Sequence, residues 1–87
     1  MSVVEFTIAV LSLAVRFRFS VTSWGRSEKH NHDVGGVGDS LHLVWLAMDV
    51  ELDQGEDKAA FIVAAQRQGL VVVDDGGDLH VQIPRIR

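Results

Sequence analysis

Two hydrophobic periods follow one another in the first part of the chain. Between residues 3 and 13, apolar side chains recur every three or four positions, which predicts a helix with one apolar face. From residue 15 to residue 21 every second residue is apolar and those between are Arg or Ser, which predicts a half-buried strand. We expect the helix to cover one face of the sheet that contains this strand.

A polar stretch follows at residues 23–40, rich in Gly, Ser, Asn, His and Asp. It predicts a loop of about eighteen residues, which is longer than loops without a function usually are. His30 and His32 are expected to be surface residues of this loop. Its glycines do not form a phosphate loop, because the Lys-Ser/Thr ending of that motif is absent.

Strand-like alternation returns at residues 46–52, with Asp49 on the polar face. A helix is then predicted over residues 56–68. Asp53 is the expected N-cap, and Gly69 is expected to close the helix in a left-handed conformation.

The end of the chain predicts a β-hairpin. Residues 70–73 form an apolar strand, Asp-Asp-Gly-Gly at 74–77 forms a turn, and residues 78–83 alternate again. With the apolar positions of the last strand facing the core, the residues on its polar face are Asp78, His80 and Gln82.

These elements indicate the α+β class, with a small antiparallel sheet and a helix or two packed on one face. A length of 87 residues predicts one domain over residues 1–87, close to the lower size limit for stable folding. The chain has no cysteine. A disulfide therefore cannot stabilise it, and a metal would have to be held by His, Asp or Glu.

The charge pattern argues against nucleic acid as a partner, because the net charge is -4 and the basic residues are scattered. The apolar segment 6–15 is too short to cross a membrane and lacks the leader and cleavage site of a signal peptide. We therefore expect a protein made in the cytoplasm that stays there unless it is released, with no membrane partner. The sequence leaves the oligomeric state open.

His42, Asp49 and His80 are the main candidates for chemistry. Two imidazoles and one carboxylate are typical of a catalytic zinc site, since they leave one tetrahedral position open for water or substrate. If the strands of Asp49 and His80 are antiparallel neighbours, both side chains project from one polar face. His42 would fold back over that face from the end of the Gly-rich loop.

Residues 22–49 read TSWGRSEKHNHDVGGVGDSLHLVWLAMD and resemble the zinc D-alanyl-D-alanine carboxypeptidase family, which includes phage endolysins and vancomycin-resistance dipeptidases. The family pattern is an Arg-containing segment, a Gly-rich loop, the motif Ser-x-His-x-x-Gly-x-Ala-x-Asp and a later His on a strand. The residues that match are Arg26, Ser40, His42, Ala47, Asp49 and His80. The resemblance covers residues 5–84 and implies that the two His and Asp49 bind zinc. Together with the strand faces it predicts an α+β fold with the helices on one face of the sheet and a zinc site on the other.

Two positions depart from the family pattern. Trp45 stands where the family has Gly, so the backbone or the pocket wall there is expected to differ. Gly77 stands three residues before His80, where the family places its acidic general base. Asp78 is the nearest carboxylate and our candidate catalytic base, because an i, i+2 pair on a strand shares one face. The alternative bases are Asp75 and Glu51.

The resemblance implies a zinc-dependent metallopeptidase that hydrolyses peptidoglycan stem peptides or D-Ala-D-Ala-type substrates, at a terminal or an internal bond. Arg26 would pair with a substrate carboxylate through its planar guanidinium, and Ser40 would support substrate binding by hydrogen bonding. The resemblance also implies a cell-wall lytic role for a phage-encoded protein, which would require release from the cytoplasm or a place in the virion. Two alternatives stay open: a zinc-binding, non-catalytic protein for peptide recognition or structure, and a small α+β protein without a metal.

Overall fold

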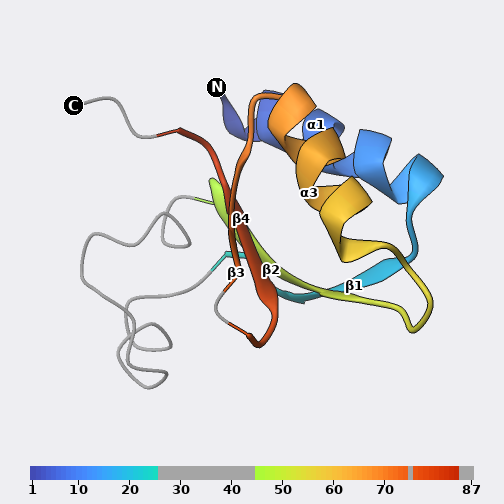
Figure 1. Cartoon of the computed structure of the whole chain (residues 1–87). Helices are drawn as coiled ribbons and strands as arrows, with labels where there is room; N and C mark the ends of the chain where they lie inside the picture. The colour runs from blue at the N-terminus through green and yellow to red at the C-terminus, as the bar shows by residue number, and fades with distance from the viewer. Residues whose placement is uncertain (26–44, 75, 85–87) are drawn as a thin grey trace, which may run out of the picture.

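A four-stranded antiparallel sheet carries two helices on one of its faces (Figure 1). The computed structural model describes residues 1–25, 45–74 and 76–84. Its elements are α1 (Val3–Arg16), β1 (Phe19–Ser23), β2 (Ala47–Leu52), α3 (Lys58–Arg67), β3 (Val71–Asp74) and β4 (Leu79–Gln82). The predicted α+β class, with helices packed on one face of an antiparallel sheet, is confirmed for this part of the chain.

Helix α1 begins with a reciprocal cap. The Ser2 hydroxyl accepts a hydrogen bond from the Glu5 backbone N–H, and the Glu5 carboxylate accepts one from the Ser2 backbone N–H. The helix runs three residues beyond its predicted end, so the strand prediction was wrong over residues 15–18. Helical hydrogen bonding overrides the alternating pattern there: the N–H of Phe17 still donates to the Leu13 carbonyl at 2.9 Å. Neither helix in the described ranges is long and apolar enough to cross a membrane.

Helix α3 is capped by Asp57 and not by the predicted Asp53. The Asp57 carboxylate accepts a backbone N–H of the first turn at 3.1 Å. Asp53 instead donates its N–H to the Arg18 carbonyl at 3.0 Å, which ties it to the chain leading into β1. The helix therefore starts later than predicted, at Lys58. Gly69 has φ +82, as predicted for the residue that closes the helix.

The strands lie in the order β1-β2-β4-β3, so β2 and β4 are neighbours in the centre of the sheet. Asp49 on β2 pairs directly with His80 on β4, and Val50 pairs with Leu79. Because side chains alternate along a strand, Val50 and Leu79 face the helices while Asp49 and His80 face away from them. The two strands are thus the antiparallel neighbours that a shared polar face requires, and the expectation that Asp49 and His80 project from that face is confirmed.

The core between sheet and helices centres on Phe61 of α3, which is 1% exposed. Its ring meets Phe17 and Phe19 edge-on, with centroids 5.4 and 5.5 Å apart. Its other buried neighbours in the core cluster come from both helices and both central strands: Phe6, Val10, Leu13, Met48, Val50, Ala64, Ala65, Leu79 and Val81. Phe61 thus joins the start of the sheet to α3.

We predict that Phe61→Ala lowers the free energy of unfolding by about 3–5 kcal/mol, because it removes buried apolar surface and leaves a cavity. Val63→Ala on the same helix is the matched control. Val63 is 46% exposed, so its truncation should cost less than about 0.5 kcal/mol. Chemical denaturation of both variants measures the difference. Equal losses would contradict a core organised around Phe61.

Candidate functional site

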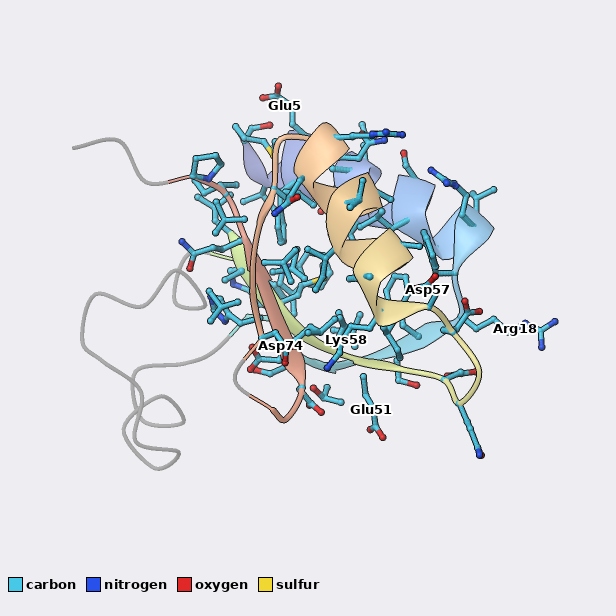
Figure 2. The ribbon with its side chains drawn as sticks, in the orientation of Figure 1. Glu5, Arg18, Glu51, Asp57, Lys58 and Asp74 are labelled. Carbon is cyan, nitrogen blue, oxygen red and sulfur yellow. The ribbon has the colours of Figure 1, made fainter. Side chains whose placement is uncertain are left out.

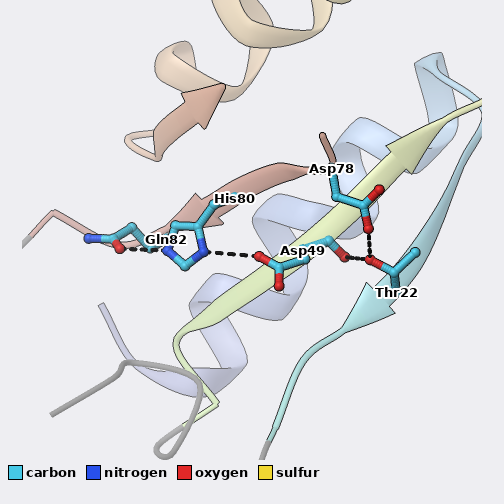
Figure 3. Close-up of polar contacts among 5 residues, drawn as sticks. All are labelled: Thr22, Asp49, Asp78, His80 and Gln82. Atoms are coloured by element: carbon cyan, nitrogen blue, oxygen red, sulfur yellow. Dashed lines mark hydrogen bonds and ion pairs between the residues drawn. The ribbon is translucent and has the colours of Figure 1, made fainter. Parts of the chain in front are cut away.

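The sheet face that points away from the helices carries a close acid–imidazole pair. The Nδ1 atom of His80 lies 3.0 Å from Oδ1 of Asp49 (Figure 3). The two side chains are 29% and 27% exposed, respectively, so the pair is partly shielded but still open to a ligand. The direct cross-strand register of β2 and β4 brings them together.

Gln82 extends this pair along β4. It lies two residues beyond His80 and therefore on the same face. Its Oε1 atom is 2.7 Å from Nε2 of His80, on the other side of the imidazole ring from Asp49 (Figure 3). Both ring nitrogens of His80 are thus in contact with oxygen atoms.

Thr22 is the residue of β1 that contacts the site. The register between β1 and β2 shifts between Val21 and Ser23, and such a bulge redirects the side chain within it. The Thr22 hydroxyl approaches both the backbone carbonyl of Asp49, at 3.2 Å, and the carboxylate of Asp78 (Figure 3). Thr22 therefore links the strand of Asp49 to the turn that carries Asp78.

Asp78 lies in the turn before β4, because that strand begins at Leu79. The prediction that Asp78 is part of the strand was wrong, and its carboxylate contacts the Thr22 hydroxyl from the turn. Asp78 nevertheless lines the same open hollow of about 590 Å³ as Asp49 and His80, together with Val73 and Gly77.

The alternative bases differ in position. Glu51 lines a separate hollow beside the β2–α3 connection, with no residue of the Asp49–His80 pair in its wall. Asp75 lies outside the described residues. Of the carboxylates that the structure describes, Asp78 is therefore better placed than Glu51 to serve the hollow that contains His80.

Trp24 and Trp45, which flank residues 26–44 in the sequence, contact each other. The indole N–H of Trp24 donates to the Trp45 carbonyl at 3.0 Å, and the two rings meet edge-on with centroids 5.3 Å apart. A Cβ atom on Gly25 would lie 2.0 Å from the Trp45 ring, so only glycine fits there. The two tryptophans therefore pack on each other, and their contact ties the chain just after β1 to the chain just before β2.

Trp45 adopts φ +63, in the left-handed region where glycine is favoured. This is the position at which the family pattern has Gly. The tryptophan thus keeps a backbone conformation that suits glycine, at a cost of about 1–2 kcal/mol. Its ring contact with Trp24 helps to offset that cost.

The other predicted site residues, Arg26, Ser40 and His42, lie outside the described residues. Within residues 1–25, 45–74 and 76–84, no group of three His, Cys, Asp or Glu side chains is placed to hold a metal. Asp49 and His80 contribute a carboxylate and an imidazole, two of the donor types that bind zinc.

Sequence reasoning assigned no role to Thr22 or Gln82. For Gln82 a signal existed, because its two-residue spacing from His80 places both on one face. For Thr22 there was none, because its position depends on a bulge that the alternating pattern does not show.

The chain matches one protein-family model, Peptidase M15, over residues 10–81. The match runs from α1 to β4 and includes both Asp49 and His80. No curated protein and no solved structure matches the chain.

The turn before Asp78 is held at its start by Asp74. The Lys58 ammonium lies 2.9 Å from the Asp74 carboxylate (Figure 2), and the Gly76 N–H donates to that carboxylate at 3.1 Å. The hydrogen bond from Lys58, followed by that from Gly76, lowers the pKa of Asp74 below its ordinary value of 3.8. Asp74 therefore joins α3 to the turn that leads to Asp78.

A lowered pKa in the folded state means that ionised Asp74 stabilises the fold. This contribution is complete above the ordinary pKa of 3.8 and is lost as the pH falls through the lower folded value. We predict that Lys58→Met raises the pKa of Asp74 in an NMR titration of its carboxyl carbon, whereas Lys58→Arg leaves it lowered. An unchanged pKa in Lys58→Met would show that the ion pair does not hold Asp74.

Proposed function

The chain belongs to the peptidase M15 family, that of the zinc D-alanyl-D-alanine carboxypeptidases, and from this membership we propose that it is a zinc-dependent metallopeptidase that hydrolyses peptidoglycan stem peptides or D-Ala-D-Ala-type substrates. The family itself supports a metallopeptidase of the peptidoglycan-peptidase kind. One structural observation carries the rest: Asp49 and His80 face each other at 3.0 Å on an open face of the sheet.

Zinc would be held by Asp49 and His80 together with His42, the third ligand that the family resemblance implies. In such a site the metal acidifies a water molecule and polarises the scissile carbonyl. His42 precedes Asp49 by seven residues in the sequence, and Asp49 lies on β2.

Asp78 is our proposed general base. It lines the hollow shared by Asp49 and His80, so its carboxylate can accept a proton from the attacking water and pass it to the departing amine. The Thr22 hydroxyl contacts one oxygen of this carboxylate and fixes its direction. Gly77, at the family's usual base position, has no side chain that could accept the proton.

Arg26 and Ser40 are the proposed substrate-binding residues. A guanidinium pairs with a carboxylate through two parallel hydrogen bonds, and a peptide that ends in D-Ala presents such a carboxylate. The proposal extends to a cell-wall lytic role. The protein would be encoded by a phage and would act on the cell wall after release from the cytoplasm or from the virion. That setting rests on the family resemblance alone.

The second candidate is a zinc-binding protein that recognises stem peptides or serves a structural role without hydrolysing them. The observation that favours it is Gly77, which removes the acidic side chain from the family's base position. The contact of Asp78 with Thr22 favours it as well, because that contact takes up part of the acceptor capacity a base needs.

The base is tested with the zinc-loaded chain acting on peptidoglycan stem peptides and D-Ala-D-Ala. We expect product release that a chelator abolishes. Asp78→Asn should keep its zinc and its thermal midpoint while turnover falls by at least about a hundredfold, since the amide cannot take the proton. Glu51→Gln is the matched control, because Glu51 lines a different hollow.

Three results would revise the proposal. Wild-type protein that holds zinc but releases no product would establish the binding-only function. Full activity in Asp78→Asn together with loss in Asp75→Asn or Glu51→Gln would move the base to that residue. Turnover that survives removal of all metal would contradict a metallopeptidase.

A further inference from the structure

The amide of Gln82 is fixed in one orientation beside His80. Its Nε2 group donates to the Ile83 carbonyl at 3.2 Å, which turns Oε1 toward the imidazole. That Oε1 atom lies 2.7 Å from Nε2 of His80. The cross-strand neighbours of Gln82 are Ala47 on β2 and Val71 on β3, two side chains that offer no hydrogen bond.

This orientation determines where the imidazole carries its hydrogen. An amide oxygen can only accept a hydrogen bond, so Nε2 of His80 must donate one. In a neutral imidazole the other nitrogen then has a lone pair and no hydrogen. In His80 that nitrogen is Nδ1, and it points at a carboxylate oxygen of Asp49 at 3.0 Å (Figure 3).

Two atoms that present lone pairs to each other at this distance require a positive charge between or beside them. A proton on Nδ1 would supply it, and so would a metal ion bound to both atoms. Histidines that bind metals usually donate their other ring N–H to an oxygen acceptor, which fixes the tautomer and the direction of the ring. Gln82 is placed to be that acceptor.

We propose that Gln82 is a positioning residue for the metal: it holds His80 in the Nε2–H tautomer, so that Nδ1 and the Asp49 carboxylate bind one zinc ion together. This inference rests on the proposed function. It adds the identity of the binding nitrogen and the residue that selects it. The hydrogen bond from Gln82 to the Ile83 carbonyl keeps the amide oxygen of Gln82 turned toward the imidazole ring.

The test compares variants of the full chain by competition with a chromophoric zinc chelator. Gln82→Met keeps the length of the side chain but removes the acceptor. We expect it to weaken zinc binding by about 10- to 100-fold, the usual effect of losing such a partner. Gln82→Glu keeps an acceptor oxygen and should bind zinc as tightly as the wild type or more so. Gln66→Met, on the exposed side of α3, is the matched control and should not change affinity.

The tautomer of His80 is a second measurable quantity, and it would not depend on Gln82 if Gln82 only stabilised the fold. In ¹⁵N NMR spectra of the zinc-loaded wild type, we expect His80 to show a protonated Nε2 and a metal-bound Nδ1. If Gln82→Met does not fold, this spectrum still decides the question. Zinc bound through Nε2 of His80 would overturn the inference, as would wild-type zinc affinity in folded Gln82→Met.

These outcomes are separable from failure of the proposed function. A wild-type chain that binds no zinc overturns the proposed metallopeptidase and this inference with it. A wild-type chain that binds zinc and hydrolyses stem peptides, while Gln82→Met binds zinc equally well, overturns only the role of Gln82.

Discussion

The register between β2 and β4 is the constraint on which the site depends. It places Asp49 opposite His80 and, on the other face, Val50 opposite Leu79. A slip of one residue would exchange the two faces of a strand and send its polar side chains into the core. Burial of the apolar face against Phe61 and the helices therefore fixes the polar pair as well. Packing energy and site geometry are specified by the same strand pairing.

Much of this arrangement can be predicted from the sequence, because apolar and polar residues alternate clearly in the two central strands. The alternation in β2 and β4 identifies both strands and places Asp49 and His80 on their polar faces. The sequence leaves the pairing of these two strands as a condition, and the structure shows that the condition is met. Segments with competing signals are less predictable. Residues 15–18 alternate in polarity like a strand. Val15 and Arg16 nevertheless belong to helix α1.

The caps and the bulge could not be predicted for a different reason. Asp53 and Asp57 are equally good N-cap residues by type, and the choice between them depends on the contact of Asp53 with Arg18, 35 positions earlier in the chain. The hydroxyl of Thr22 reaches Asp78 only because the register shifts beside it. Both are consequences of tertiary packing, and neither leaves a local pattern in the sequence.

The departures from the family pattern act on the site in different ways. Trp45 retains a backbone conformation that suits glycine and adds a ring contact with Trp24, so this change is accommodated. Gly77 lacks the acidic side chain, and Asp78, the next residue in the turn, lines the hollow of Asp49 and His80 and is therefore our proposed base. The metal ligands that we propose do not depend on either change. We therefore propose that Asp49 and His80 bind a metal whether or not hydrolysis follows.

Elemental analysis of the purified chain after mild dialysis tests that claim most directly. We expect close to one equivalent of zinc per chain in the wild type and its loss in His80→Ala, because the imidazole and the Asp49 carboxylate face each other at 3.0 Å. His32→Ala serves as the control and should keep its zinc. A folded wild-type protein without zinc, or zinc that is retained in His80→Ala, would contradict the claim.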